Sequence, residues 1–324
     1  MAHTFITPSQ VASVAVKALG RRAVLAGTVT RDYDQEFRGA VGDTVTVRIE
    51  STSTAAEYNG SGTITYSDIT EIPVAVQLSK WVYDAKKLTD KEAALNVKNV
   101  QAQVVAPQFR AVARKLESYV AAQMAAPTYP AGQKVAWGAN LAGVNAATWG
   151  AILDAGQILD DNEVDPADRF LAVGSAGRKA ILSDPDLKRF DGSNSTDALR
   201  KAIVGEYAGF TVVFSPLINA QKAYAYHRSA FILATLAPPV PEGAVAGSSA
   251  AEDGFGMTWI RDYDPDVLSD RSVVQAFAGT APVYDGATVS SFKRAVELTI
   301  PTSWPHPSPG PYASPLRARW GTTS

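Results

Sequence analysis

The segment VVAPQFRAVARKL, residues 104–116, lies inside the longest run of helical apolar spacing in the chain. The spacing extends from Val97 to Ala126, and Pro127 ends it. The apolar stripe changes phase at Pro107, where the missing N–H and the ring disfavour a straight helix. The segment therefore predicts a long helix with a kink at this proline.

Before this helix, residues 44–50, TVTVRIE, alternate apolar and polar side chains as a half-buried strand does. The alternation returns from Ile72 to Tyr83 and predicts a single second strand there. The residues between them, 51–62, are polar and end in an Asn-Gly-Ser-Gly run that favours a tight turn. We therefore expect residues 43–83 to form a long hairpin whose middle buries little and which needs a neighbour to cover it.

The second half of the chain mixes helical and strand patterns, which predicts an α+β fold. Met257–Tyr263 and Ser272–Phe277 have the pattern of paired strands. Proline, glycine and serine from Pro238 to Ala251 predict a flexible loop. The other elements expected here are helices at 148–160, 175–182 and 197–204, strands at 169–173 and 210–214, and a strand followed by a short helix at 223–235.

The composition changes after residue 283. Six prolines lie between Pro301 and Pro315, and three large aromatic residues are interleaved with them: Trp304, Tyr312 and Trp320. Proline-rich chain does not form a domain by itself, and large aromatic side chains are costly to leave exposed. We therefore expect residues 284–324 to form an arm that lies on another surface.

Composition narrows the class of protein. Of 324 residues, 46% are hydrophobic and 19% are charged, which is typical of a globular chain. The formal net charge of −2 argues against a protein that wraps nucleic acid, and the absence of cysteine excludes disulfides and thiolate metal sites. We expect no secretory signal in residues 1–20 and no membrane partner, because no stretch approaches the roughly 18 apolar residues of a spanning helix.

The sequence contains no convincing motif for catalysis or for binding of a small ligand. The three histidines, His3, His227 and His306, lack the spacing of a metal-binding helix. The run GSAGRK, residues 174–179, follows an expected strand but lacks the spacing of a phosphate loop, so a strand-to-helix turn is the better interpretation. The aromatic residues Trp81, Tyr83 and Trp149 are expected in the core rather than stacked on a ligand.

Acidic clusters are the remaining candidates for a metal site. Asp262, Asp264, Asp266 and Asp270 alternate as calcium ligands do, but the glycine and glutamate of a calcium loop are missing. A solvated acidic turn is the favoured interpretation. The cluster from Asp160 to Asp165 is expected to be a charged helix end. We therefore predict no catalytic residue, no metal and no cofactor.

The order of these features resembles the Hong Kong 97-type major capsid proteins of tailed phages. Three stretches carry the resemblance: residues 33–48, YDQEFRGAVGDTVTVR, look like the entry to the extended loop, residues 104–116 look like the spine helix, and residues 205–216, GEYAGFTVVFSP, are similar to the axial domain. The resemblance covers roughly residues 5–283. It implies an α+β Hong Kong 97-like fold with an N-terminal arm, an extended β-hairpin loop, a long spine helix, and peripheral and axial domains.

The resemblance also implies a division of the chain. The expected parts are an N-terminal arm at 1–42, the extended loop at 43–88, the spine helix and peripheral domain at 89–165, the axial domain at 166–256, return strands at 257–283 and the arm at 284–324. The residues expected to contact neighbouring subunits are Glu57, Tyr58 and Asn59 in the hairpin and Trp304, Tyr312 and Trp320 in the arm.

The function implied is a coat protein that self-assembles into hexamers and pentamers of an icosahedral head around double-stranded DNA. The expected partners are other copies of the chain, a separate scaffolding protein, a portal protein, and DNA held without sequence specificity. A decoration protein is a further partner that the resemblance allows. The expected location is the virion, assembled in the bacterial cytoplasm. The alternatives are an encapsulin-type cargo compartment with the same fold, a metal-dependent hydrolase using the Asp262–Asp270 loop, and a tail or decoration protein.

Overall fold

The computed structural model describes residues 24–31, 44–49, 72–91, 104–137, 147–183, 205–252, 255–285 and 292–301, together with residues 55, 57, 58, 64 and 66. These residues form two larger sheets, a two-stranded ribbon and three helices of at least two turns, which confirms the predicted mixed α+β class. The helix expected at 197–204 lies outside the described residues.

The first large sheet, here called the long sheet, is antiparallel and five-stranded. Its longest strand, β12, pairs with β11 and β3 along one half and with β9 beyond it. The pairing of β11 with β12 confirms the predicted strand pair at 257–263 and 272–277. The strands are β3 (Lys80–Thr89), β9 (Phe231–Leu236), β10 (Ala246–Glu252), β11 (Phe255–Asp264) and β12 (Ser269–Pro282).

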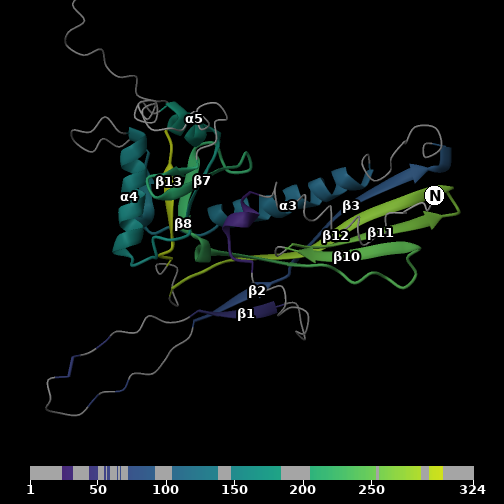
Figure 1. Cartoon of the computed structure of the whole chain (residues 1–324), viewed down its shortest axis with the longest axis horizontal. Helices are drawn as coiled ribbons and strands as arrows, with labels where there is room; N and C mark the ends of the chain where they lie inside the picture. Colours follow the sequence, from purple (N-terminus) through teal and green to yellow (C-terminus); the bar gives the residue numbers. More distant parts are fainter. Residues whose placement is uncertain are drawn as a thin grey trace, which may run out of the picture.

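Helix α3 (Ala106–Ala125) lies along this sheet (Figure 1). Its apolar stripe is fully buried and includes Phe109, Val112, Leu116 and Met124. Pro107 lies in the first turn of α3, where its missing N–H removes no helical hydrogen bond. The part of the predicted helix before residue 104 lies outside the described residues.

The second large sheet has six strands in the order β4-β13-β8-β5-β7-β6, and its pairings are both parallel and antiparallel. The predicted elements at 148–160, 169–173, 175–182 and 210–214 are confirmed as α4, β5, α5 and β7. Its elements are β4 (Lys134–Ala136), α4 (Ala147–Asp161), β5 (Arg169–Val173), α5 (Ser175–Ser183), β6 (Glu206–Tyr207), β7 (Phe210–Phe214), β8 (Lys222–His227) and β13 (Ala295–Thr299).

One core joins the two sheets. Helices α4 and α5 pack on one face of the six-stranded sheet through residues such as Ile152, Leu159 and Ile181. The opposite face contributes Tyr224 and Tyr226 to the cluster that contains the buried stripe of α3. The described part of the N-terminal segment also packs here, because Leu25 is buried and its N–H donates to Glu117 Oε1 at 3.0 Å.

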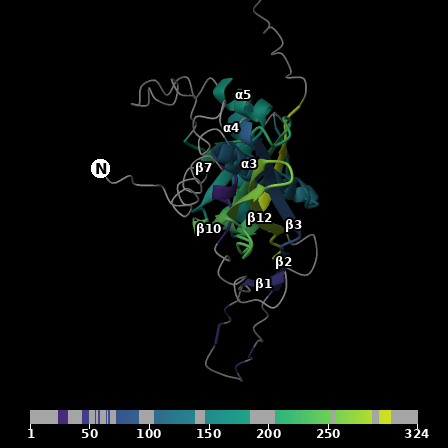
Figure 2. The same cartoon turned by 90° about the vertical axis from the view of Figure 1, so that its right-hand side faces the viewer.

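Strands β1 (Thr44–Ile49) and β2 (Ile72–Gln77) form the predicted antiparallel ribbon, with Ile49 opposite Ile72 at its outer end. The ribbon lies on the opposite side of the long sheet from α3 (Figures 1 and 2). Its base is held by Val76, which is buried against Ile232, Ala234 and Ala281.

The prediction of one strand from Ile72 to Tyr83 is wrong. The chain leaves the ribbon after Gln77, and β3 starts at Lys80 in the long sheet, where it pairs with β12. Val76 and Val82 are both buried, as the alternation requires, but in different clusters. Alternation records which side chains are buried and not which strand is the partner.

Three further expectations need correction. Residues 223–235 form β8, a 3-10 turn η6 (Arg228–Ala230) and β9 rather than a strand and a helix. Part of the expected flexible loop is β10, whose small residues are held by pairing with β11. The arm expected from residue 284 begins later, because Phe292 is buried and β13 is inserted between β4 and β8.

The two sheets also cut across the expected division of the chain. Segment 166–256 contributes β5 to β8 to the six-stranded sheet but β9 and β10 to the long sheet. Strands β4 and β13, from segments 89–165 and 284–324, join the six-stranded sheet. The order of segments along the chain does not predict that strands from one segment join the sheet of another.

Candidate functional site: a groove between β3 and α3

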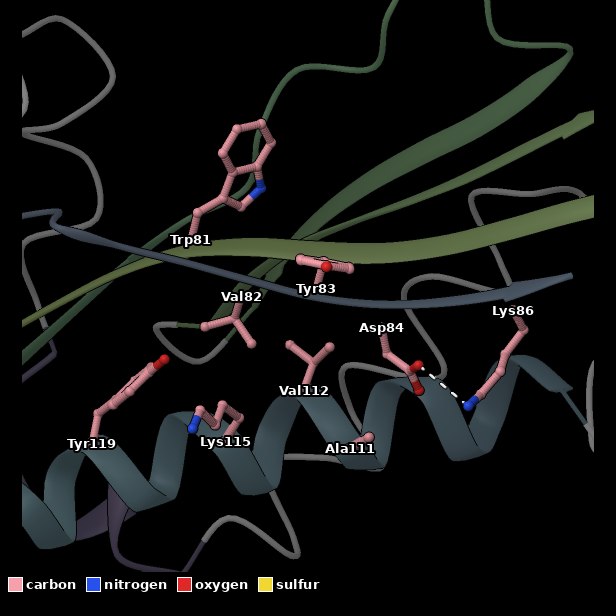
Figure 3. Close-up of a pocket in the computed structure, with 9 residues that line it drawn as sticks. All are labelled: Trp81, Val82, Tyr83, Asp84, Lys86, Ala111, Val112, Lys115 and Tyr119. Carbon is pink, nitrogen blue, oxygen red and sulfur yellow. Dashed lines mark ion pairs between the residues drawn. The ribbon is translucent and has the colours of Figure 1, made fainter.

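A groove of about 530 Å³ runs between strand β3 and helix α3 (Figure 3). Strand β3 is the last strand of the long sheet, and no other described strand pairs with its outer edge. The groove is lined by Trp81, Val82, Tyr83, Asp84 and Lys86 from β3 and by Ala111, Val112, Lys115 and Tyr119 from α3.

The floor of the groove is apolar and fixed. Val82 and Val112 point toward each other between the strand and the helix (Figure 3), and both are buried. Gln108 sets the position of the helix, since its Nε2 donates to Ser272 O at 2.8 Å and to Asp84 O at 3.1 Å. Ser272 Oγ donates in return to Gln108 Oε1 at 2.7 Å. A buried amide with all its partners holds one register between helix and sheet.

The face of β3 opposite to α3 carries exposed aromatic side chains. Trp81 and Tyr83 lie on the side of β3 away from Val82, with 65% and 70% of their surface exposed. Trp81 is held in place, because its Nε1 donates to Gln275 Oε1 at 3.1 Å and its ring lies 5.3 Å from that of Phe277. Large exposed aromatic side chains on an ordered strand are typical of an interaction surface.

The prediction that Trp81 and Tyr83 lie in the core is therefore wrong. In the sequence, Trp81 and Tyr83 alternate with the apolar Val82. This alternation could have predicted that both aromatic side chains lie on the outer face of the strand. Trp149 is partly buried and packs edge-on against Tyr207 with ring centroids 5.0 Å apart, so for this residue the core interpretation is nearer the structure.

The two elements that form the groove carry more basic than acidic side chains, and the lining itself holds Lys86, Lys115 and Asp84. Strand β3 and helix α3 together carry six basic side chains and two carboxylates, whereas the whole chain has a net charge of −2. Asp84 is paired with Lys86 at 3.5 Å, and Glu117 accepts the N–H of Leu25. Lys115 lies over the Tyr119 ring at 5.3 Å and forms no ion pair with a described residue. The basic residues are Lys80, Lys86, Lys87, Arg110, Arg114 and Lys115.

The predicted contact residues are only partly described. Glu57 and Tyr58 are exposed in the hairpin, and Tyr58 has 59% of its surface exposed. Asn59, Trp304, Tyr312 and Trp320 lie outside the described residues.

The acidic loop is the turn of the β11–β12 hairpin. Asp262 pairs with Arg271 at 2.6 Å, and Asp264 lies 3.4 Å from the same arginine. Asp270 pairs with Arg261. Within the described part of the chain no group of three or more potential ligands is placed to hold a metal. These carboxylates have arginine partners across the hairpin.

The GSAGRK run at residues 174–179, which superficially resembles a phosphate loop, forms a strand-to-helix turn, as predicted. Gly174 joins β5 to α5, and a side chain there would lie 2.3 Å from the carbonyl oxygen of Asn219. The turn is therefore a close backbone contact within the six-stranded sheet. Of the helices that the structure describes, none is long and apolar enough to cross a membrane.

Two tyrosines whose pKa values are raised lie in the core and do not form a reaction site. Burial, with a smaller effect of Glu297, raises the pKa of Tyr224 to about 12. Burial also raises the pKa of Tyr129 well above its usual value, and its hydroxyl donates to Met124 O at 2.7 Å. Both hydroxyls keep their protons at any ordinary pH and act as structural groups.

Comparison with known proteins gives the family. The family model of phage capsid proteins matches residues 19–237, which is more than half of the chain. A search of curated protein sequences gives no significant match.

Solved structures match over most of the chain at low sequence identity. A structure from Mycobacterium phage Che8 has a TM-score of 0.59 at 15% identity, covering 92% of this chain and 93% of that one. The capsid of cyanophage P-SCSP1u has a TM-score of 0.57 at 15% identity, covering 82% and 85%. The mature capsid of bacteriophage PhiM1 has a TM-score of 0.55 at 11% identity, covering 94% and 90%.

These matches confirm the expected Hong Kong 97-like fold, and the family match decides for a phage capsid over a cargo compartment, a hydrolase or a tail protein. Capsids are built from many copies of their subunits, so the chain associates with itself. The chain belongs to the phage capsid protein family, and it is a major capsid protein: a structural component of the virion head and not an enzyme.

Proposed function

We propose that copies of this chain assemble into the hexamers and pentamers of an icosahedral head that encloses double-stranded DNA. The proposed partners are a separate scaffolding protein during assembly, a portal protein, and a decoration protein where one exists. The net charge of −2 supports a head that holds DNA without strong or sequence-specific binding.

The sheets suggest how the proposed domains are built. The peripheral domain would consist of the long sheet with α3, and the axial domain of the six-stranded sheet with α4 and α5. The extended loop would be the β1–β2 ribbon and its tip, with its base on Val76. This division groups strands by their pairing, so it moves β9 and β10 out of the axial domain and β13 out of the arm.

The observation that carries the proposed contact between subunits is complementary charge. Residues 50–71, between β1 and β2, contain four acidic residues and no lysine, arginine or histidine. Strand β3 and helix α3, which form the groove, carry six basic and two acidic side chains. Because the ribbon lies on the side of the long sheet away from α3 (Figure 1), the groove is proposed to receive the tip of a neighbouring copy.

Apolar surface supports the same pairing. In the tip, Tyr58, Ile64 and Tyr66 have 59%, 58% and 89% of their surface exposed. On strand β3 of the facing partner, Trp81 and Tyr83 are exposed on the face away from α3, beside the groove. Each covered aromatic ring removes about 150–250 Å² from water and dominates interface energetics. In this proposal, Glu57, Tyr58 and Asn59 dock beside Lys115, and the aromatic residues at the edge strand β3 extend the contact.

The residues after Pro301 are proposed to act as a strap between subunits. Pro301 is exposed and follows the core residue Ile300, so the chain leaves the six-stranded sheet at this point. Prolines hold the chain extended and so reduce the entropy lost on docking. Trp304, Tyr312 and Trp320 would be the anchors.

A charge exchange between tip and groove tests the contact. Glu57→Lys and Lys115→Glu should each reduce the yield of assembled particles at least about tenfold, because like charges then meet across the interface. The double variant should recover a large part of the yield. Particle yield is measured by sedimentation and negative-stain microscopy, and the melting temperature of the unassembled subunit shows that each variant is folded.

Two exposed charges on the six-stranded sheet, Glu206 and Lys134, provide matched controls. Glu206→Lys and Lys134→Glu should assemble with normal yield. A double Glu57/Lys115 variant that assembles no better than the worse single variant, with normal controls, would overturn the tip-and-groove contact. It would leave the membership of the capsid family untouched.

A further inference from the structure

Two chain crossings lie side by side where the long sheet meets the six-stranded sheet. The first runs from the end of β8 through η6 into β9, and the second is described at residues 283–285, after β12, and at residues 292–294, before β13. Backbone hydrogen bonds join them, because Val283 N donates to Ala230 O at 2.9 Å and His227 N donates to Arg294 O at 3.0 Å. We call this region the joint.

A polar cluster connects the side chains of the joint. His227 Nδ1 accepts from the backbone N–H of Ser229 at 3.2 Å and lies 2.8 Å from Ser229 Oγ. Arg294 Nη1 donates to the same Oγ at 2.8 Å, so the hydroxyl hydrogen is directed to His227. Arg294 Nε donates to Asp285 Oδ1 at 2.6 Å. This pattern requires a lone pair on His227 Nδ1, which means a neutral imidazole.

Charges on the neighbouring elements disfavour a proton on His227. Arg169 is its register partner on β5, and Arg294 precedes the strand on its other side. Asp165 and Asp168, from the loop before β5, favour the proton. Burial first, and then Arg294, place the pKa of His227 below its ordinary value of 6.5 despite these two carboxylates.

We propose that His227 is a pH-sensitive latch on the joint: the neutral ring orients the Ser229 hydroxyl, which accepts Arg294 Nη1 from the second crossing, and the protonated ring becomes a donor that competes for this hydroxyl and repels the arginine. A proton on Nδ1 converts the acceptor into a donor that faces the Ser229 N–H. It also places a third cation near Arg169 and Arg294. In weak acid the joint loosens, and the two sheets gain freedom to change their relative angle.

The sign of the pH effect follows from the lowered pKa. The unfolded chain binds a proton to His227 near pH 6.5, and the folded chain binds it only at lower pH. The contribution to stability is therefore fully present above this value and is lost as pH falls through the folded pKa. The direction is opposite to that of a histidine paired with a carboxylate.

Hydrogen exchange of the full-length unassembled subunit tests the latch and does not depend on assembly. Between about pH 7.5 and about pH 5.5, corrected for intrinsic rates, exchange of the joint peptides that contain His227 and Val283 should rise roughly tenfold. His227→Gln keeps an acceptor but cannot be protonated, so its exchange should not respond. The control replaces the other two histidines, His3→Gln with His306→Gln, and should respond as the wild type does.

An acid response that persists in His227→Gln, or a wild type without one, would overturn the latch. If His227→Gln does not fold, NMR titration of the wild-type imidazoles decides, with the control variant giving the assignment. A His227 that titrates below its ordinary pKa while the joint amides lose protection supports the latch. A His227 that titrates at or above that pKa contradicts it.

Discussion

At the scale of single residues, Gln108 determines how α3 lies on the long sheet. Its amide is fully buried and links the helix to two strands, β3 and β12. The sequence shows this glutamine only as a polar residue beside the apolar stripe. Its partner Ser272 is 164 residues away, and no local pattern records a hydrogen bond across that separation.

Gln108→Leu should lower the free energy of unfolding of the subunit by about 2–4 kcal/mol, because it leaves the carbonyl groups of Asp84 and Ser272 buried without this partner. Denaturant unfolding of the unassembled subunit is the measurement. Gln157→Leu, at an exposed position of α4, is the matched control and should change stability by less than about 0.5 kcal/mol. Equal effects of the two substitutions would show that the buried network is not needed.

At the scale of elements, the position of the β1–β2 ribbon depends on one close backbone contact. Gly279 in β12 faces the carbonyl of Gln77, and a Cβ at Gly279 would lie 2.3 Å from that oxygen. The ribbon base can therefore sit on β12 only where β12 lacks a side chain. The sequence gives the ribbon strands by alternation, but it does not show that this glycine supports them.

Gly279→Ala should displace the base of the ribbon and lower subunit stability by about 1–3 kcal/mol. Because the tip then points in a different direction, particle yield should fall even where the subunit is still folded. Gly132→Ala is the control, since no atom lies within 4 Å of its added Cβ. Normal stability and normal particle yield for Gly279→Ala would contradict this account.

The elements that sequence predicted well are those with strong local periodicity, such as α4, β5, β7 and the β11–β12 pair. Those it missed depend on distant partners. Strand β10 is built from small residues and exists because β11 pairs with it. Strand β13 is short and precedes a proline-rich segment, so the composition predicted an arm there. The strand forms because it pairs with two neighbours, β4 and β8. The groove between β3 and α3 was missed for the same reason, because its lining residues come from two elements that are separate in the sequence.

At the scale of the whole molecule, Ile300 is the last buried residue in the described part of the chain, and we expect the subunit core to need nothing beyond it. Removal of residues 302–324 should therefore leave the melting temperature of the unassembled subunit unchanged. It should lower that of assembled shells, because the proposed strap is lost. Truncation after Arg294 is the contrasting variant, since it removes Ala295, Val296 and Leu298, all fully buried, and should prevent folding. Shells that melt normally without residues 302–324 would remove the strap from the proposal.

The order of the six-stranded sheet has a consequence for synthesis on the ribosome. Strand β13, near the end of the chain, is the strand that connects β4 to β8. The nascent chain can therefore close this sheet only after its five other strands have been translated and β13 has left the exit tunnel. A prematurely terminated chain lacks the connecting strand and cannot present a finished subunit to its neighbours. We therefore expect translation products that end before β13 to stay out of the growing head.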